Sequence, residues 1–288
     1  MAKVRDVWRD LVLTLREHHL SGPTREARLM LADVLSTSPS HIYLFWDQDL
    51  AQEKMEKLYL MLEERFNGVP LQYVLGEWEF FSLSFDIRKG VFIPRLDTES
   101  WLEEAIITLR ARFNHDQGII CDLGCGSGVI GLTTAYWIPG IQVYAIDISR
   151  PAVDMTLHNA GKLGIDSRVI VELSDLFQDF ASSSTIQFDA ILSNPPYVKE
   201  EEWFTLSPDI RLHEPKDALV SGSDGLDLIR RILNDSSSYL KKEGFLYLEH
   251  DPSQVEAIAE IASPTPLRWD HIISDYQGQP RATVFIRR

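Results

Sequence analysis

A glycine-rich stretch in the middle of the chain indicates how the protein is built: Ile119-Ile120-Cys121-Asp122-Leu123-Gly124-Cys125-Gly126-Ser127-Gly128. An apolar run leads directly into closely spaced glycines. Glycine lets the backbone turn tightly and approach a ligand closely. Asp147 ends the next apolar run, 21 residues after Gly126, where a carboxylate can accept hydrogen bonds from both hydroxyls of a ribose. The pattern predicts a strand, a loop and a helix that together bind a nucleoside.

Strand and helix signals alternate from this stretch onward, which is typical of a doubly wound α/β fold with a parallel sheet. Apolar runs predict strands over residues 119–121, 143–146, 169–173, 190–192 and 245–248. Helical spacing predicts a helix over residues 97–112. Its expected buried face holds Trp101, Leu102, Ala105, Ile106 and Leu109. Two late runs, 271–274 and 282–286, predict an antiparallel pair that closes one edge of the sheet. The serine clusters 182–184 and 236–238 predict loops.

The first 70 residues have a different pattern, with three segments of apolar residues at helical spacing. The expected buried positions are Val4, Val7, Trp8, Leu11, Val12, Leu15, Ala27, Met30, Leu31, Val34, Met55, Leu58, Leu62 and Phe66. Short amphipathic helices cannot bury themselves singly, so they predict a small bundle. Alternating apolar residues then predict a β-hairpin that turns at Lys89-Gly90. We therefore expect a helical domain over residues 1–75, a β-hairpin linker over 76–95 and a catalytic domain over 96–288.

The charge balance bears on the class of partner. The 288-residue chain has a formal net charge of −15, and residues 76–288 carry 32 acidic against 19 basic side chains. Proteins that grip nucleic acid present Lys and Arg to the phosphates, so direct nucleic-acid binding is not expected. No apolar run reaches membrane-spanning length, and the first residues lack the apolar core of a signal peptide. We therefore expect no membrane partner and a cytoplasmic location.

The cysteines and histidines do not indicate a metal or redox site. Cys121 and Cys125 lack the Cys-x-x-Cys spacing, so we expect both to be buried packing residues. The eight histidines are scattered, without a His-Glu-x-x-His pattern. No metal is therefore expected.

A second motif, Asn194-Pro195-Pro196-Tyr197, directly follows the apolar run 188–193. Proline has no backbone N–H and favours extended geometry in the residue before it, so the carbonyls of Asn194 and Pro195 lack partners in a sheet ladder. These carbonyls and the Asn194 side chain can accept hydrogens from an amide or an exocyclic amine, and Tyr197 offers a flat stacking surface. A plain rigid turn is the structural alternative. The motif predicts a site for methyl transfer to a planar nitrogen.

Glycine spacing alone does not separate two classes of nucleoside-binding enzyme, because Gly126-x-Gly128-x-x-Gly131 also satisfies the dinucleotide fingerprint of dehydrogenases. Asp122 precedes the first glycine, where it could meet the ammonium group of S-adenosylmethionine. Asp175 and Leu176 follow the third expected strand and are positioned to touch an adenine. Asp122 and the Asn-Pro-Pro-Tyr motif together favour a methyltransferase.

With both motifs in place, the chain resembles the HemK/PrmC family, the protein-(glutamine-N5) methyltransferases that modify the Gly-Gly-Gln loop of class-1 peptide chain release factors. Further stretches extend the resemblance over most of the chain: Pro70-Leu71-Gln72-Tyr73-Val74-Leu75-Gly76-Glu77-Trp78-Glu79-Phe80, Ile93-Pro94-Arg95, Thr98-Glu99, Glu214-Pro215 and Asp224-Gly225-Leu226. The chain departs from the family pattern at Leu96, where the family usually has proline, and at Pro280. These departures affect local loop shape and leave the chemistry untouched.

The resemblance implies a Rossmann-like, class I methyltransferase fold that uses S-adenosylmethionine, with the N-terminal helices docking the release factor. The cofactor contacts that it implies are Gly124, Cys125, Gly126, Ser127, Gly128, Asp147, Leu176 and Asn194. The catalytic residues that it implies, which hold the target glutamine, are Asn194, Pro195, Pro196 and Tyr197. Phe92 and Arg95 are expected to line the cofactor pocket. Two oxygens, Asn194 Oδ1 and the Pro195 carbonyl, would orient the glutamine nitrogen, so no general base is expected.

Other functions stay open on the sequence alone. An exocyclic adenine amine needs the same acceptors and the same stacking surface, so a DNA adenine-N6 methyltransferase is one alternative. A glutamine of a ribosomal protein is another candidate substrate. Outside methyl transfer, a nicotinamide-dependent oxidoreductase and a non-catalytic nucleoside-binding module are the alternatives. The acidic charge of the chain weighs against DNA.

Overall fold

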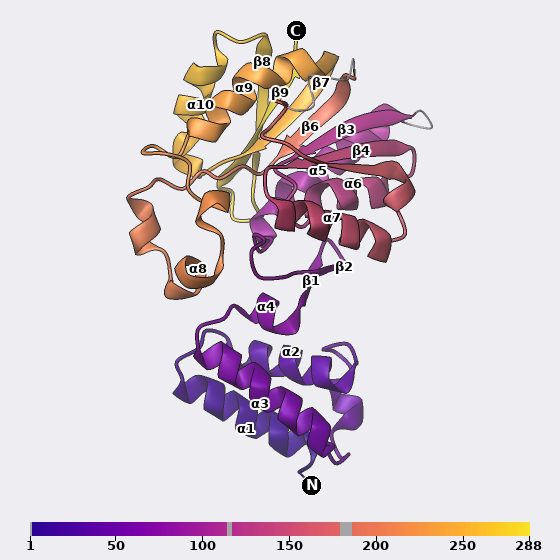
Figure 1. Ribbon diagram of the computed structural model, residues 1–288, viewed down its shortest axis with the longest axis vertical. Coiled ribbons are helices and arrows are strands. Elements are labelled where there is room, and N and C mark those ends of the chain that lie inside the picture. The colour runs from indigo at the N-terminus through magenta and orange to yellow at the C-terminus, as the bar shows by residue number, and fades with distance from the viewer. Residues whose placement is uncertain (1, 114–116, 179–185) are drawn as a thin grey trace. The chain divides into compact units, whose positions relative to one another are not determined.

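The computed structural model describes residues 2–113, 117–178 and 186–288. The chain divides into two compact units, Met1–Gly76 and Glu77–Arg288, each with its own core. Figure 1 shows the first unit as helices alone and the second as a sheet covered by helices. In the described part of the chain, no helix combines the length and the apolar character needed to cross a membrane.

The first unit is a helical bundle, as the sequence predicted. Its elements are α1 Val4–Glu17, α2 Pro23–Leu35, the short 3₁₀ helix η1 Ile42–Phe45, α3 Gln52–Phe66 and α4 Leu71–Leu75. Arg65 of α3 forms a buried, two-pronged ion pair with Glu26 of α2, at 2.9 and 3.0 Å. Phe66 was expected in the core but is exposed, because it lies in the last turn of α3, where its ring stacks on His18 at 3.7 Å. The five-residue helix α4 is too short to give a periodic signal.

A β-hairpin opens the second unit, but its turn is not where the sequence placed it. Strands β1 Glu77–Phe80 and β2 Leu83–Asp86 pair antiparallel. The chain turns at Phe81 and Ser82, which have φ of 52° and 61°, rather than at Lys89-Gly90. Positive φ at both central residues matches the twist of a tight hairpin, but such turns usually contain Asn or Gly. Phe81 and Ser82 are not typical of such turns, so the sequence pattern did not indicate a turn at this position.

A seven-stranded sheet forms the centre of the second unit, in the order β5-β4-β3-β6-β7-β9-β8. Its strands are β3 Gly118–Leu123, β4 Ile141–Asp147, β5 Val169–Leu173, β6 Phe188–Ser193, β7 Leu240–Glu249, β8 Leu267–Ser274 and β9 Pro280–Arg287. The pairings among β3 to β7 are parallel, whereas β9 pairs antiparallel with both β7 and β8. The doubly wound sheet and its antiparallel edge are thus confirmed.

Helices cover both faces of this sheet. The helices of the second unit are α5 Leu96–Phe113, α6 Val129–Trp137, α7 Arg150–Lys162, α8 Pro208–His213, α9 Asp227–Tyr239 and α10 Val255–Ala262, with short 3₁₀ helices η2 Asp166–Arg168, η4 Glu202–Thr205, η5 Lys216–Ala218 and η6 Pro252–Gln254. Helix α8 lies on a segment that extends away from the sheet (Figure 1). On one face, α9 and α10 share an apolar cluster with Cys121 and Leu123. Successive strand residues point to opposite faces, and Asp122 meets α6 on the other. Figure 1 shows α5, α6 and α7 on that side. All five residues expected to be buried on α5 are buried.

One serine cluster is helical rather than a loop. Ser236–Ser238 lie in the last turns of α9, where Ser236 Oγ donates to the Ile232 carbonyl at 2.6 Å. A serine hydroxyl bonded to the preceding turn is satisfied inside a helix, so the cluster does not interrupt it. The other cluster, residues 182–184, lies outside the described residues.

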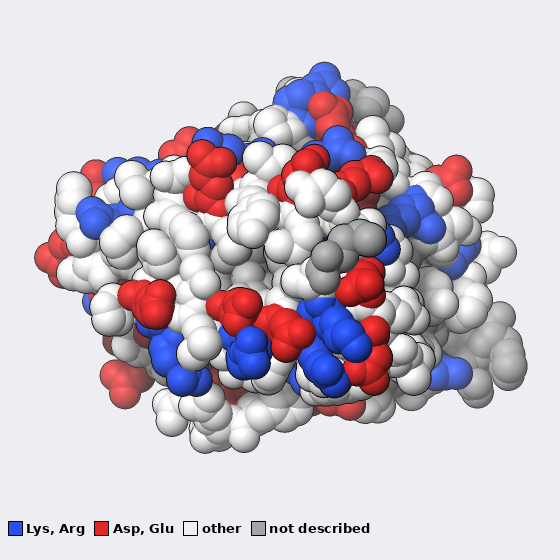
Figure 2. All heavy atoms as spheres, turned by 90° about the horizontal axis from the view of Figure 1, so that it is seen from below, with Lys and Arg blue, Asp and Glu red and all other residues white. Residues whose placement is uncertain are grey.

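Charged side chains are mixed in sign on the face that Figure 2 presents. Lys and Arg atoms lie next to Asp and Glu atoms there, with wide uncharged areas between them. That face therefore carries no continuous basic surface of the kind that phosphates attract.

Candidate active site

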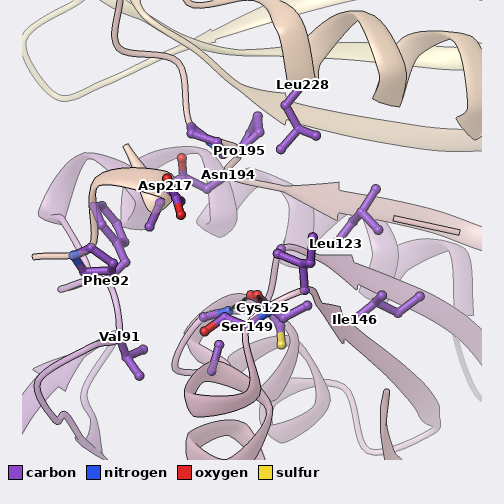
Figure 3. Close-up of a pocket in the computed structure, with 18 of the residues that line it drawn as sticks. Val91, Phe92, Leu123, Cys125, Ile146, Ser149, Asn194, Pro195, Asp217 and Leu228 are labelled. Carbon is purple, nitrogen blue, oxygen red and sulfur yellow. Dashed lines mark hydrogen bonds between the residues drawn. The ribbon is translucent and has the colours of Figure 1, made fainter. Parts of the chain in front are cut away.

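The loops at the carboxyl ends of the parallel strands surround a cavity of about 740 Å³, a usual size for a small-molecule site. Ligand sites of doubly wound sheets lie at this edge because the loops there diverge. In Figure 3, Asn194 and Pro195 lie across the cavity from Cys125 and Ser149, and Phe92 lies at one side. The two sequence motifs, 70 residues apart, are thus brought to one cavity.

The glycine loop presents bare backbone to this cavity. Gly124 and Gly126 have φ of 77° and 58°, and a Cβ on either would meet nothing within 4 Å. Gly128 differs, because a Cβ there would stand 2.7 Å from Leu132 Cδ1. Gly124 and Gly126 line the cavity, whereas Gly128 does not and instead begins α6. Two glycines therefore leave room for a ligand, and the third allows close packing.

Cys125 and Ser127, which complete the loop, also line the cavity. Burial raises the pKa of the Cys125 thiol well above its ordinary range, and it does the same for Cys121. Both are therefore inert packing groups, as predicted. Helix α7 holds the loop in place, because Thr156 donates to the Gly126 carbonyl at 3.1 Å and Asn159 to the Ser127 carbonyl at 2.9 Å.

Asp147 lines the cavity at the end of β4. Its Oδ2 accepts from the Gly126 N–H at 2.9 Å, and its Oδ1 from the Ser149 N–H at 2.8 Å. Burial raises the pKa of this carboxyl, and the backbone hydrogen bonds oppose the rise. Because each carboxylate oxygen can accept a second hydrogen, the fixed carboxylate can still accept from the hydroxyls of a ribose.

Asp175 and Leu176 line the cavity after β5. Leu176 is buried and packs into the apolar cluster beneath the sheet edge. Asp175 Oδ1 accepts from Arg231 of α9 at 2.8 Å, and Oδ2 accepts from Gln178 at 3.3 Å. The Asp175 carboxylate is therefore held on both oxygens, each of which can still accept a second hydrogen, and Leu176 offers an apolar contact for a flat ring.

Asp122 does not line the cavity, contrary to the expectation that it meets an ammonium group. It is fully buried, and its Oδ2 accepts from the Gly131 N–H of α6 at 2.8 Å. The pKa of Asp122 is raised to about 7 in total: burial raises it most, the charge of Asp147 also raises it, and the Gly131 hydrogen bond lowers it. Asp122 thus joins β3 to the first turns of α6.

Phe92 lines the cavity as expected, but Arg95 does not. The Arg95 guanidinium lies over the Phe92 ring at 4.9 Å and pairs with Glu214 at 2.6 Å. Buried Glu214 also accepts from the Ile93 N–H at 3.2 Å. Arg95 and Glu214 therefore tie the segment before α5 to the segment after α8, and both segments contribute to the cavity wall.

Asn194, Pro195 and Pro196 line the cavity. Asn194 Nδ2 donates to Thr98 Oγ1 at 3.2 Å, which leaves Oδ1 as an acceptor. Within the described ranges, no donor meets the Pro195 carbonyl oxygen. The two acceptors that the motif predicted are both present at the cavity.

Tyr197 lies outside the cavity lining. Its hydroxyl donates to Glu249 Oε1 at 3.3 Å, and its carbonyl accepts from Gln254 at 3.0 Å. Its ring packs against the apolar cluster, and burial raises the pKa of its phenol. In this arrangement Tyr197 anchors the motif to the sheet and offers no stacking surface to the cavity.

Glu249, which the sequence analysis missed, is a fully buried carboxylate beside the site. It accepts hydrogens from Thr98 at 2.7 Å and Trp101 at 2.6 Å, besides Tyr197. It ends the apolar strand β7 as Asp147 ends β4, and that shared position was a signal that could have found it. In the described part of the chain, no three His, Cys, Asp or Glu side chains are placed to hold a metal ion.

Three features of this unit are those of the class I methyltransferases. They are the order of the strands in the sheet, the glycine loop that follows β3 and the acid at the end of β4. Solved structures agree at the level of the fold. The hMettl16 catalytic domain in complex with the MAT2A 3′UTR hairpin 6 is 13% identical, with a TM-score of 0.53 over 81% of each chain. The T. thermophilus 16S rRNA methyltransferase RsmC in complex with AdoMet and guanosine is 17% identical, with a TM-score of 0.51 over 74% of this chain and 50% of that one.

Sequence comparisons identify the family. Residues 89–223 match the family model of the methyltransferase small domain, and residues 6–76 match that of the PrmC N-terminal domain. The release factor glutamine methyltransferase of Moorella thermoacetica is 32% identical to this chain, over 99% of both chains. That of Chlorobaculum tepidum is 36% identical, over 81% of this chain and 80% of the relative. The chain belongs to the release factor glutamine methyltransferase family.

The protein is therefore an S-adenosylmethionine-dependent methyltransferase, and the residues present at the cavity fit that cofactor. Gly124 and Gly126 have open space where a side chain would stand. The Asp147 carboxylate suits a ribose, and Leu176 suits an adenine. Asn194 and Pro195, across the cavity, suit the acceptor of the methyl group.

Proposed function

We propose that this enzyme transfers the methyl group of S-adenosylmethionine to the side-chain amide nitrogen of the glutamine in the Gly-Gly-Gln motif of class-1 peptide chain release factors. The observation that carries the proposal is the pair of acceptors, Asn194 Oδ1 and the Pro195 carbonyl, at the nucleoside cavity. The names of the relatives support the substrate, since they specify the glutamine of a release factor.

The chemistry needs acceptors because an amide nitrogen is a poor nucleophile, with its lone pair delocalised into the carbonyl. When bound, S-adenosylmethionine supplies the methyl group on a positively charged sulfur. Asn194 and Pro195 would each accept one hydrogen of the glutamine amide, which fixes the direction of the nitrogen. Both oxygens also stabilise the positive charge that develops on that nitrogen.

A proton must leave the nitrogen after methylation. Carboxylates line the cavity at Asp147, Asp175, Asp217 and Asp227, but the chemistry does not require any of them as a tuned base. Among the described residues that line the cavity there is no histidine. An N-protonated amide is strongly acidic, so it can release its proton to water without a tuned side chain. The site therefore works through orientation and electrostatics, and it needs no general base.

The cofactor contacts that we propose are Gly124, Cys125, Gly126, Ser127, Asp147, Leu176 and Asn194. Gly128 contributes by starting α6, and Tyr197 by holding the Asn-Pro-Pro segment through Glu249. We place the substrate contacts at Asn194, Pro195 and Pro196.

The helical unit Met1–Gly76 is proposed to dock the release factor. It carries exposed apolar side chains on η1 and α3, among them Leu44 at 74% and Leu60 at 63% exposure. Exposed apolar groups of this kind are used in protein contacts. We further propose that the enzyme works in the cytoplasm, where its substrate takes part in translation.

Mass spectrometry of candidate substrates, each incubated with the enzyme and S-adenosylmethionine, tests the proposal. The substrates are a class-1 release factor, its Gly-Gly-Ala variant, ribosomal proteins and duplex DNA. One methyl group on the Gly-Gly-Gln glutamine, and none on the variant, is the expected result. A methylated adenine, or a methylated ribosomal glutamine with an unmodified release factor, would contradict it. The formal net charge of −15 makes DNA the less favourable substrate.

A further inference from the structure

A chain of hydrogen bonds connects Asn194 to a buried carboxylate that the reaction itself does not use. Asn194 Nδ2 donates to Thr98 Oγ1 at 3.2 Å, and Thr98 Oγ1 donates to Glu249 Oε2 at 2.7 Å. Thr98 and Glu249 are 2% and 1% exposed. Thr98 lies in the first turn of α5 and Glu249 at the end of β7. Packing of the helix against the sheet therefore fixes the position of the Thr98 hydroxyl, which is the group that meets Asn194.

The direction of each hydrogen bond follows from the groups around Glu249. The Trp101 indole N–H, which can only donate, points at the same Oε2 at 2.6 Å. The Tyr197 hydroxyl donates to Oε1 at 3.3 Å. An ionised carboxylate has no hydrogen of its own, so Glu249 can only accept from the Thr98 hydroxyl. Thr98 therefore gives its only hydrogen to Glu249 and can only accept from Asn194.

This direction matters because the two ends of an asparagine amide are almost identical in shape and opposite in hydrogen bonding. With Nδ2 on Thr98, Oδ1 faces the cavity and can accept from a glutamine amide. In the flipped state, an N–H would face the N–H of the glutamine, and the proposed acceptor would be lost. No steric contact needs to change for the flip to occur, so a hydrogen-bond partner must prevent it.

The burial of Glu249 supports a specific role. A buried carboxylate is costly unless it is compensated, and within the described residues Glu249 forms no ion pair within 4 Å. It is compensated by three hydrogen-bond donors, Trp101, Thr98 and Tyr197, and by the positive charge of Arg281 at longer range. A neutral apolar residue would fill this place without that cost, but it would leave the direction of the Thr98 hydroxyl unspecified.

We propose that Glu249, acting through Thr98, positions the Asn194 amide so that its oxygen faces the reacting nitrogen. This inference rests on the proposed function. It makes Thr98 and Glu249 positioning residues that hold the acceptor rather than groups that touch the reacting atoms. Tyr197 belongs to the same device, because its hydroxyl occupies the other oxygen of Glu249.

The first test needs no substrate and reads the Asn194 amide itself. The chain has five asparagines, so selective ¹⁵N-asparagine labelling gives five pairs of side-chain amide signals, and the Asn194 pair is assigned by its absence in Asn194→Asp. Thr98→Val is expected to shift this pair and to speed its hydrogen exchange, whereas Thr98→Ser preserves it. Glu249→Leu is expected to act like Thr98→Val, while Glu249→Gln, which keeps an oxygen for Thr98 and Trp101, preserves the pair. An Asn194 signal that is unchanged in Thr98→Val would overturn the proposal.

The second test measures turnover. Thr98→Val is expected to lower kcat for release factor methylation by about 10- to 100-fold, with the Kd for S-adenosylmethionine changed by less than about threefold, and Thr98→Ser is expected to restore kcat. Thr133→Val is the matched control, because Thr133 is also fully buried and, among the described residues, its hydroxyl has no partner. It is expected to keep the wild-type kcat. Wild-type kcat in Thr98→Val, or an equal loss in Thr98→Ser, would refute the role of the hydroxyl.

The two tests separate this inference from the proposed function. If the wild-type enzyme fails to methylate the release factor at all, the proposed function fails, and the amide signals still show whether Thr98 holds Asn194. If the wild type is active and Thr98→Val is equally active, the proposed function stands and the positioning role falls.

Discussion

Asp122→Asn removes a carboxylate that is buried between β3 and α6. Asp122 Oδ2 accepts from the Gly131 N–H, and within the described ranges Oδ1 has no partner. Burial raises the pKa of Asp122 from 3.8 to about 7, against the effect of the Gly131 hydrogen bond and with a further contribution from the charge of Asp147. The folded protein therefore holds the proton more tightly than the unfolded chain does.

The sign and size of the effect on stability follow from this difference. A carboxyl whose pKa is raised on folding stabilises the folded state fully below the unfolded pKa, and this contribution is lost as the pH rises through the folded pKa. Because a tenfold change in proton affinity is about 1.4 kcal/mol, moving the pKa from 3.8 to about 7 corresponds to about 4 kcal/mol. About 1.5 kcal/mol of this is already lost at pH 5, so about 2–3 kcal/mol is lost between pH 5 and pH 8.5.

Asparagine keeps an oxygen for Gly131 and does not ionise. We expect the free energy of unfolding of Asp122→Asn, relative to the wild type, to increase by about 2–3 kcal/mol from pH 5 to pH 8.5. Urea denaturation of both proteins at several pH values measures it, and titrating groups that do not interact with Asp122 cancel in the difference. Asp154→Asn, on the exposed side of α7, is the control and should follow the wild-type profile. A difference between Asp122→Asn and the wild type that does not vary with pH would refute the reasoning.

The glycines and Asp147 give further predictions. Gly128→Ala should destabilise the protein by about 2–4 kcal/mol in thermal or urea unfolding, because it combines left-handed backbone strain with a Cβ 2.7 Å from Leu132. Gly126→Ala should cost only about 1–2 kcal/mol of stability, since nothing lies within 4 Å of its Cβ, yet weaken S-adenosylmethionine binding clearly; equal losses of stability in the two variants would contradict this contrast. Asp147→Ala should weaken cofactor binding by about 1–3 kcal/mol in calorimetry, and an unchanged Kd would show that Asp147 does not bind the ribose.

The parts of the fold that sequence could predict are those encoded by local pattern. The parallel strands appear as apolar runs. The glycine loop appears as closely spaced glycines, among them Gly126, whose positive φ few other residues adopt. The antiparallel edge of the sheet was also predictable, because two apolar runs are separated by turn residues. The hairpin turn at Phe81 and Ser82 was not, because these residues adopt left-handed backbone without the usual turn composition.

The parts of the site that sequence could not predict depend on which way a side chain points and on what it meets far along the chain. Asp122 was expected at the cofactor, but the pleat of β3 turns it towards α6. Tyr197 was expected to stack on the substrate. Its hydroxyl instead donates a hydrogen bond to the buried Glu249, 52 residues away along the chain. Thr98 and Asn194, 96 residues apart, meet only because α5 packs over the end of the sheet. Such contacts are set by tertiary packing, which a local pattern does not contain.

The role of the Asn194 oxygen is tested by the single-turnover rate of methyl transfer to the release factor at saturating S-adenosylmethionine, compared between the wild type, Asn194→Ala and the Thr133→Val control. We predict that Asn194→Ala lowers this rate by about 100-fold or more, while Thr133→Val keeps the wild-type rate and all three proteins unfold at similar temperatures. A wild-type rate in Asn194→Ala would show that the acceptor at this position does not hold the reacting amide, and the account of the site would be wrong.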